Sequence, residues 1–575
     1  MTSRFTLFYL FAISLLFFNS CLDSNKDSAT MIIHGGTIYT VDDNQATVEA
    51  VAVKDNTILF AGSLEEAESY KNEQTKFLDL EGKTMTPGLI EGHGHFMGLG
   101  YNELRLDLMN TKSYQDIIDA VAERVKTAEP GEWIIGRGWH KSKWDSVPEY
   151  TVKGFQTHHR LSEVSPNNPV YLRHASGHAG FANAKAMDIA GLSSLSAEGI
   201  KNYDIEGGEV IVDEFGRPTG VFNERAQGLI GKHFPRNTPE SDTQAFNLAI
   251  EACYKNGITS FQDAGIGRGT IALYDRMKSE GKMNIRIYAM LTGWDEELIN
   301  EWYEKGPNID PDNRFTIRSI KLNCDGALGS RGAWLLEPYT DRPDHYGHET
   351  LPMEVVKQTS LNGLRNGFQV CSHAIGDRAN REILDRYEAA LTELSMLDTD
   401  HRFRIEHAQH LHPDDIPRFA ELQVIPAMQA VHMSSDRPWA IDRLGEKRIK
   451  EGAYVWQDLL KSGIPIVNGT DVPVEPLNPI PSFYASVSRK TLKGTPEGGY
   501  EPEQKMTREQ ALKSYTLDAA YGAFEEDIKG SISAGKLADF TIYNQDLMTV
   551  DESEILNTEV VMTIFDGKIV YKKKD

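Results

Sequence analysis

The chain has 575 residues and a formal net charge of −24 at pH 7. This length exceeds what one hydrophobic core usually supports, so we expect a main domain with accessory parts. The negative charge argues against a nucleic-acid partner, because a polyanion would be repelled over most of the surface.

The N-terminus predicts a signal peptide at residues 1–20. It contains one arginine, an apolar stretch from Phe5 to Phe18 and small polar residues before Cys21. The stretch is short for a membrane span, and a buried N-terminal helix is the alternative. FNSC resembles a bacterial lipobox, although Phe18 replaces the usual aliphatic residue. A lipidated Cys21 with a polar linker at 21–30 would tether the protein to a membrane of the cell envelope, facing the periplasm or the exterior.

The remaining cysteines predict no disulfide framework. Cys253, Cys324 and Cys371 are an odd number and fall in segments that read as barrel helices or strands. We expect buried thiols that pack as small apolar groups.

Short strands with turn signals occupy both ends of the chain, at 31–85 and 531–575. Each segment is too short to form a domain alone. Two independent edge hairpins are the alternative, but they would leave apolar faces exposed.

Eight apolar runs between these ends predict the strands of a parallel sheet. Helix-like segments separate most of them, such as DTQAFNLAIEACYKNG before the second run and RANREILDRYEAALTEL after the fifth. The runs lie at 86–93, 258–262, 285–291, 315–322, 368–372, 402–406, 423–428 and 464–468.

Potential metal ligands stand at or near the C-terminal ends of five of these runs. His93 and His95 are two residues apart on one strand, so both imidazoles face the same side. Taken one at a time, such short motifs are weak evidence for a metal site. A (β/α)₈ barrel, however, brings the C-terminal ends of successive strands to one point, where nitrogen and oxygen ligands suit zinc or a similar divalent ion. The other candidate ligands are Lys321, His373, His407 and Asp471.

About 160 residues separate the first two runs, which is several times the length of an ordinary connection. We therefore expect an inserted subdomain at 100–245 that caps the substrate site, because loops above this face of a barrel set substrate preference. Structural roles for the two tryptophans are equally compatible with the sequence. The candidate pocket residues of this segment are Trp139, Trp144, Arg173, His174 and His178, and Asp325 and Arg331 complete the predicted substrate-binding set.

Many separate blocks of the chain resemble the amidohydrolase superfamily and, within it, the YtcJ-like subfamily, amidohydrolase family 3. The resemblance covers nearly everything after residue 30. It implies an α/β fold with a (β/α)₈ TIM barrel at 86–530 beside a composite β-sandwich made of 31–85 and 531–575. The blocks are PGLIEGHGH, GRGWHKSKW, HASGHAGFANAKA, DEFGRPTGVFNERA, KLNCDGALGSRGA, SHAIGDRAN, RIEHAQ, NGTDVPVEPLNP, ALKSYTLDAAYGAFEED and KGSISAGKLADFTIY.

The resemblance also implies how the ligands divide between metals. His93 and His95 would hold one divalent ion and His373 and His407 a second. An ammonium has no lone pair to give, so the family carbamylates the lysine, here Lys321, into a carboxylate that bridges two metals. A charge-paired Lys321 beside a single metal is the alternative, and we expect one or two ions, zinc foremost.

The predicted reaction is hydrolysis of an amide-like C–N bond in a small molecule. A metal lowers the pKa of water and so supplies hydroxide as the nucleophile. His178 would stabilise the oxyanion, and Asp471 would accept the water proton and pass it to the leaving nitrogen. A deaminase or an ester hydrolase on the same site is an alternative, since fold and metal do not define the substrate. A non-catalytic binding lipoprotein is a further alternative, but such a protein would be free to lose ligands, and here all six positions hold suitable residues. The sequence leaves open whether the protein forms a homodimer.

Overall fold

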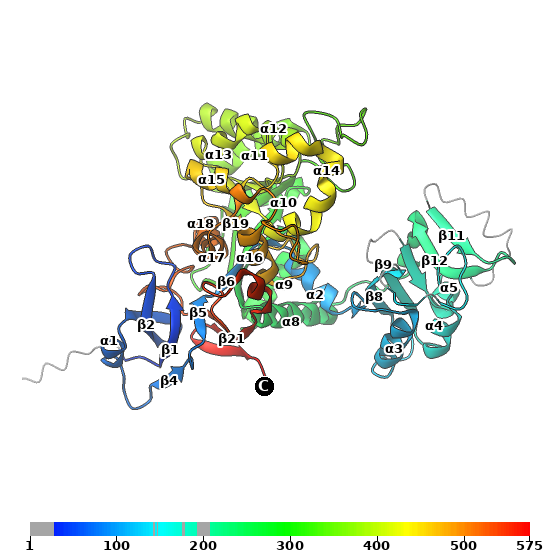
Figure 1. The fold of residues 1–575 in the computed structure, drawn as a ribbon, viewed down its shortest axis with the longest axis horizontal. Helices are drawn as coiled ribbons and strands as arrows, with labels where there is room; N and C mark the ends of the chain where they lie inside the picture. The colour runs from blue at the N-terminus through cyan, green and yellow to red at the C-terminus, as the bar shows by residue number, and fades with distance from the viewer. Residues whose placement is uncertain (1–27, 142–143, 147, 175–178, 193–207, 575) are drawn as a thin grey trace, which may run out of the picture.

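The computed structural model describes residues 28–574, except 142–143, 147, 175–178 and 193–207. Its described part contains three sheets: a parallel barrel sheet, a sheet built from both ends of the chain and a sheet in the insertion. Figure 1 shows the barrel at the centre, with the terminal strands on one side and the insertion on the other.

Eight parallel strands form the barrel, as predicted. They follow one another around the sheet in chain order, so each ligand-bearing strand end points to the same face. The strands are β6 (Leu89–Gly94), β13 (Ile258–Ile266), β14 (Arg286–Thr292), β15 (Phe315–Asn323), β16 (Gln369–Ala374), β17 (Arg404–His407), β18 (Ile425–Met428) and β19 (Val467–Asn468).

Hydrogen bonds join the first barrel strand to the segment that follows the last one. The amide of Asp471 donates to the carbonyl of His93 at 2.8 Å, and the amide of Thr470 donates to the carboxylate of Glu91 at 2.6 Å. A Cβ on Gly92 would lie 2.4 Å from the carbonyl oxygen of Asn468, so only glycine permits this approach. The contacts bring Asp471 to the end of β6.

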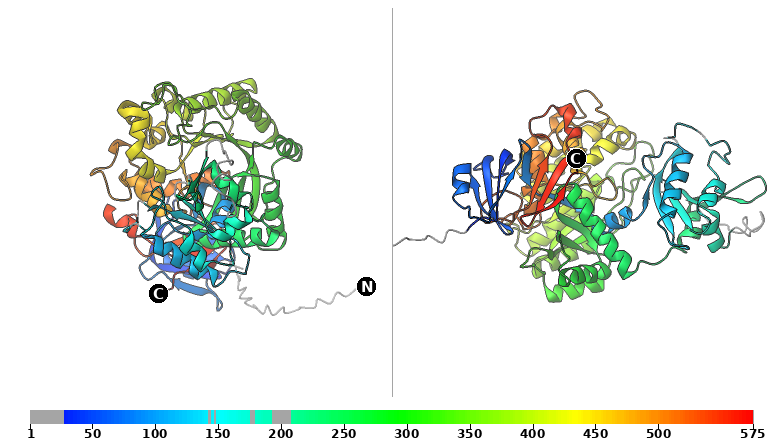
Figure 2. Two further views of the ribbon diagram at one scale, coloured as in Figure 1. Left: turned by 90° about the vertical axis from the view of Figure 1, so that its right-hand side faces the viewer. Right: turned by 90° about the horizontal axis from the view of Figure 1, so that it is seen from below.

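Helices surround the strands (Figure 2, left). Their local sequence explains them: α12 buries Ile383, Leu384, Tyr387 and Leu391, at helical spacing, and a capping box starts α8 at Thr238. The helices are α2 (Phe96–Glu103), α8 (Pro239–Lys255), α9 (Arg268–Ser279), α10 (Glu296–Lys305), α11 (Met353–Asn366), α12 (Asp377–Glu393), α13 (Ile416–Glu421), α14 (Ala430–Gly452), α15 (Trp456–Ser462), α16 (Pro479–Ser488), α17 (Arg508–Ser514) and α18 (Leu517–Tyr521).

The strands of the two chain ends form one hydrogen-bonded sheet, in the order β22-β21-β20-β5-β1-β2-β3, and β4 also pairs with β1. They share one core, in which Ile33 and Val51 pack with Phe540 and Ile564, so the two ends are not independent hairpins. Beside this sheet lies α1 (Leu64–Glu68). The strands are β1 (Met31–Tyr39), β2 (Thr47–Lys54), β3 (Thr57–Gly62), β4 (Lys76–Asp79), β5 (Thr84–Pro87), β20 (Phe540–Tyr543), β21 (Val560–Phe565) and β22 (Lys568–Lys572).

A buried ion pair joins this terminal sheet to the barrel. Arg286, at the start of β14, donates to the carboxylates of Asp539 at 2.7 Å and Asp566 at 2.6 Å. All three side chains are largely shielded from solvent. The guanidinium therefore ties a barrel strand to segments some 250 to 280 positions later in the chain.

The insertion has its own six-stranded sheet and hydrophobic cores. It stands beside the barrel, on the side of α2 (Figures 1 and 2), so its predicted capping role stays a prediction. The elements are β7 (Leu106–Asp107), α3 (Tyr114–Val125), β8 (Ile134–Trp139), α4 (His159–Val164), β9 (Val170–His174), β10 (Ala179–Ala182), α5 (Ala184–Ile189), β11 (Gly208–Val212), β12 (Pro218–Glu224) and α7 (Gly228–Gly231).

Cys253, Cys324 and Cys371 are free and buried, as expected. Within the described ranges, no helix has the length and apolar character needed to cross a membrane. The predicted signal peptide and Cys21 lie outside the described residues.

Candidate metal centre

His93, His95 and Asp471 converge at the junction of β6 and the segment after β19. One potential ligand atom of each lies within 4.8 Å of the other two. The Oδ1 atom of Asp471 is 3.2 Å from Nε2 of His95 and 3.7 Å from Nε2 of His93. His93 and Asp471 are buried, whereas the His95 side chain is 43% exposed, so the cluster opens toward solvent on one side.

The second predicted histidine pair adjoins this cluster. The ring centroids of His373 and His407 are 4.3 Å apart, and those of His407 and His93 are 5.0 Å apart. Lys321 is buried on β15, opposite Cys371 and two residues before the level of His373 on β16. Residues two apart on a strand share a face, so Lys321 lies on the same face of the sheet as His373, one level before it. The barrel thus brings the six predicted ligands together.

Hydrogen bonds orient two of the ligand imidazoles. Nδ1 of His407 donates to Oε1 of Gln429 at 2.6 Å, and Nδ1 of His93 makes a short contact with the carboxylate of Glu406. A proton held on Nδ1 leaves the lone pair on Nε2, which is the atom that a metal needs. Both partners therefore define the tautomer of a ligand.

Glu406 belongs to a buried ion pair beneath the cluster. Arg404 donates to Glu406 through Nε at 2.7 Å and to the carbonyl of Gly92 through Nη2 at 2.8 Å, and both side chains are fully buried. Burial would raise the pKa of Glu406, but the charges of Arg404 and His93 hold it well below the usual range. Removing one partner of such a pair typically costs about 3–5 kcal/mol of stability.

The sequence contained a signal for this pair that our prediction missed. Arg404 and Glu406 stand two residues apart along RIEH, so they share one strand face, and Ile405 between them faces the other way. Two charged residues on the inner face of a central strand require partners, which indicates a structural or ligand-orienting role.

The carboxylate of Asp325, which the sequence suggested as a substrate-binding group, makes several contacts within the protein. Its carboxylate accepts hydrogen bonds from the amides of Ile375 at 3.0 Å, Gly376 at 2.8 Å and Trp334 at 2.9 Å. Oδ1 also lies 3.3 Å from Nε2 of His373. Burial raises the pKa of Asp325 to about 7, against the lowering effect of these amides. Asp325 thus braces the end of β16, where His373 stands.

Two of the ligands have unusual backbone conformations. His407 has φ 75° and Asp471 has φ 56°, both in the left-handed region that non-glycine residues seldom adopt. Such conformations cost on the order of 1–3 kcal/mol each and concentrate at functional sites. The contacts of His407 with Gln429 and of the Asp471 amide with His93 oppose this cost.

The residues present fit a divalent cation. Burial lowers the pKa of His373 to about 3 and that of His407 well below its ordinary value, so both imidazoles are neutral near pH 7 and keep their lone pairs. Burial would raise the pKa of Asp471, but nearby histidines hold it well below the usual range. Oδ1 of Asp471 is buried without a hydrogen-bond partner among the described residues. Neutral imidazoles with a carboxylate are a typical zinc donor set.

The remaining predicted residues lie elsewhere. Trp139 is fully buried in the core of the insertion, and its indole donates to the carbonyl of Leu172 at 2.8 Å, which favours the structural alternative. Trp144 packs against that core. Arg173 and His174 end β9 within the insertion, and Arg331 pairs with Asp341 at 2.8 Å. His178 lies outside the described residues.

Comparison with known proteins identifies the family of the chain. The model of the amidohydrolase family matches residues 76–571. YtcJ of Bacillus subtilis (strain 168) is 31% identical over 552 residues, which cover 94% of this chain and 99% of that protein. The N-substituted formamide deformylase of Arthrobacter pascens is 25% identical over 559 residues, covering 94% and 98% of the two chains.

A solved structure shows the same architecture. The crystal structure of an uncharacterized metal-dependent hydrolase from Pyrococcus furiosus aligns with a TM-score of 0.70 and 26% identity, covering 90% of this chain and 100% of that one. The barrel, its ligand positions and the family match lead to one conclusion. This chain belongs to the amidohydrolase family and is a hydrolase.

Proposed function

We propose that the protein is a metal-dependent hydrolase that cleaves an amide-like, non-peptide C–N bond in a small molecule. The observation that carries the proposal is the convergence of His93, His95 and Asp471 within 4.8 Å, beside His373 and His407. The relative from Arthrobacter pascens, named for deformylation of N-substituted formamides, supports the choice of bond.

Each site residue has a role in this reaction. A bound divalent ion would lower the pKa of water and polarise the substrate carbonyl. The histidines would hold the ion, and the partly exposed His95 marks the open side where substrate would enter. Asp471 would accept a proton from the attacking water and return it to the leaving nitrogen, as a general base and then a general acid.

We also propose that Lys321 acts as a carbamate. Burial lowers the pKa of its amine, which favours the neutral form that can attack carbon dioxide. A bond forms between Nζ and the carbon, one proton leaves, and the product is a carboxylate. This group would supply the negative charge that four imidazoles lack and would bridge two ions.

Substrate profiling tests the proposed reaction. Zinc-loaded or manganese-loaded protein should hydrolyse at least one member of a panel of N-acyl amines, N-substituted formamides and cyclic amides, with release of an amine or opening of a ring. His93→Ala serves as the control and should be inactive. Turnover of carboxylic or phosphoric esters alone, or release of ammonia from an aminated ring, would refute the amide assignment.

We propose that the protein is anchored in the cell envelope through lipidated Cys21, on the strength of the FNSC sequence after an apolar stretch. In a bacterial host, wild-type protein should partition into membranes and incorporate labelled palmitate. Cys21→Ser should incorporate none. Equal labelling of the two proteins would contradict the proposal.

A further inference from the structure

The first turn of α14 borders the metal centre. Its N-cap residue is Gln429, whose side-chain oxygen accepts the hydrogen bond from His407. The side-chain nitrogen of Gln429, Nε2, donates to the carbonyl of Ala427 at 3.0 Å. His432 follows three residues later, and its backbone amide donates to the carbonyl of Gln429 at 3.1 Å. Residues three apart share a helix face. His432 therefore faces the same region as Gln429.

The imidazole of His432 lies close to the cluster without belonging to it. Its ring centroid is 6.3 Å from that of His407, and the two rings are nearly parallel, at 13°. It is farther from the His407 ring than the rings of His373, at 4.3 Å, and His93, at 5.0 Å. His432 therefore lies at the border of the candidate metal centre, beside one of its ligand imidazoles.

His432 has an unused polar atom. The side chain is largely buried, and Nε2 has no hydrogen-bond partner among the described residues. Buried polar atoms nearly always have a partner, so this Nε2 is available to a ligand bound at the metal centre.

The protein holds this histidine on a rigid element. The amide of Ala430 donates to Oδ1 of Asn468 at 3.2 Å, and the amide of Val431 donates to Oγ of Ser482 at 3.1 Å. These side chains satisfy amides that a helix N-terminus otherwise leaves free. A catalytic group gains precision when its backbone is fixed in this way.

We propose that His432 contacts the substrate and that its Nε2–H donates a hydrogen bond to the carbonyl oxygen of the bond that is cleaved. That oxygen becomes negative as water adds to the carbon, and a preorganised donor stabilises the developing charge. The inference rests on the proposed hydrolysis. It gives to a described residue the role that the sequence had suggested for His178.

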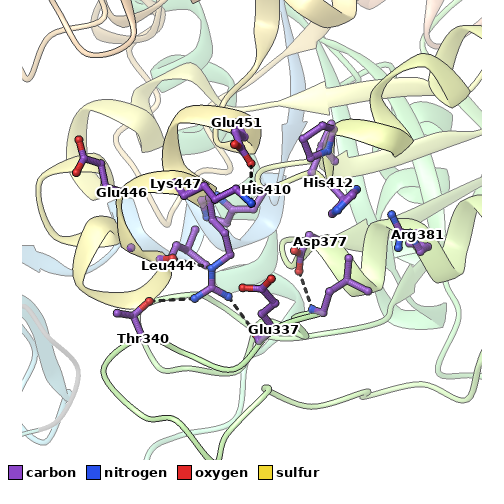
Figure 3. Close-up of a pocket in the computed structure, with 15 residues that line it drawn as sticks. Glu337, Thr340, Asp377, Arg381, His410, His412, Leu444, Glu446, Lys447 and Glu451 are labelled. Atoms are coloured by element: carbon purple, nitrogen blue, oxygen red, sulfur yellow. Dashed lines mark hydrogen bonds and ion pairs between the residues drawn. The ribbon is translucent and has the colours of Figure 1, made fainter.

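His410 offers a matched control. It is also a buried histidine, and neither ring nitrogen has a hydrogen-bond partner among the described residues. It lines a separate cavity of about 390 Å³, together with Asp377, Arg381 and Arg448, shown in Figure 3. None of the six predicted ligands lines this cavity. His410→Asn therefore removes a buried imidazole that lines a cavity other than the metal centre.

The experiment compares full-length, zinc-loaded His432→Phe, His432→Gln and His410→Asn with wild type. With N-benzylformamide, or another amide of the panel that wild type hydrolyses, His432→Phe should lower kcat by about 10²–10³-fold, as for loss of one oxyanion donor. His432→Gln keeps an N–H donor and should recover part of this loss. KM and zinc content should stay close to wild type, and His410→Asn should keep its kcat.

Binding of methylphosphonate, a tetrahedral oxyanion, gives a second readout by calorimetry. Its affinity should fall in His432→Phe and not in His410→Asn. Near-normal kcat and phosphonate affinity in His432→Phe would overturn the inference, and so would loss of zinc, which would make His432 a ligand. If wild type hydrolyses no amide of the panel, the proposed function fails, while the phosphonate measurement still tests the donor.

Discussion

Asp471→Asn is expected to lower turnover by about 10²–10⁴-fold, the range typical of a lost general acid–base. The substitution keeps the size of the side chain and an oxygen that can bind a metal, but removes the basic carboxylate. The surrounding histidines hold the pKa of Asp471 well below its usual range, so the wild-type side chain is ionised before the reaction starts. Steady-state kinetics of the metal-loaded variant measures the effect.

Asp471→Asn should leave the backbone at this position undisturbed. Asp471 stands at φ 56°, and asparagine tolerates the left-handed region better than most residues. The backbone contact between the Asp471 amide and the carbonyl of His93 is unchanged. Metal content, measured by elemental analysis, should fall far less than in His93→Ala or His95→Ala. Near-normal turnover with the metal in place would show that another residue moves the proton.

Lys321→Ala is expected to lose most of its metal, whereas purified wild type should hold about one to two divalent ions per chain, as hydrolytic metal sites do. The variant lacks the carboxylate that a carbamate would place between two ions. Short carboxylic acids, such as acetate or propionate, should occupy the vacated space and restore part of the metal content and activity. Elemental analysis with and without the acid measures both changes.

Lys529 provides the control for this experiment. It is likewise a buried lysine whose pKa burial lowers, but it pairs with Glu525 at 2.5 Å, away from the ligands. Lys529→Met should reduce stability and keep the metal. Unmodified amine density at Lys321 in a metal-replete crystal structure would rule out the carbamate, and absence of metal from wild type after zinc or manganese loading would rule out the metal site.

The eight barrel strands could be predicted from the sequence, and the candidate ligands could be placed at their C-terminal ends. Strand positions follow from short apolar runs, and helix positions from the 3.6-residue spacing seen in α12, because burial of one face imposes these periods locally. Once parallel strands are recognised, their C-terminal ends must meet. Residues as distant as His93 and Asp471 could therefore be assigned to one site before any distance was known.

The contacts that orient the candidate ligands follow from the folded chain and from no local sequence pattern. The Asp325 carboxylate, for example, accepts hydrogen bonds from three backbone amides and lies beside His373, and no sequence pattern indicated these contacts. Gln429 and His432 stand in none of the sequence blocks that carry the resemblance, and their positions beside His407 arise from packing between elements that are separate in the chain.

At the two chain ends, the sequence likewise predicts where strands form but not how they pair. Alternation predicted strands at 31–85 and 531–575, but the pairing of β5 with β20 joins residues more than 450 positions apart. Local patterns record which face of a strand is buried. They do not record which distant strand buries that face, because strand pairing depends on the free energy of the whole packed structure. In this protein, the pairing of the two chain ends accompanies a shared hydrophobic core and the buried ion pair of Arg286.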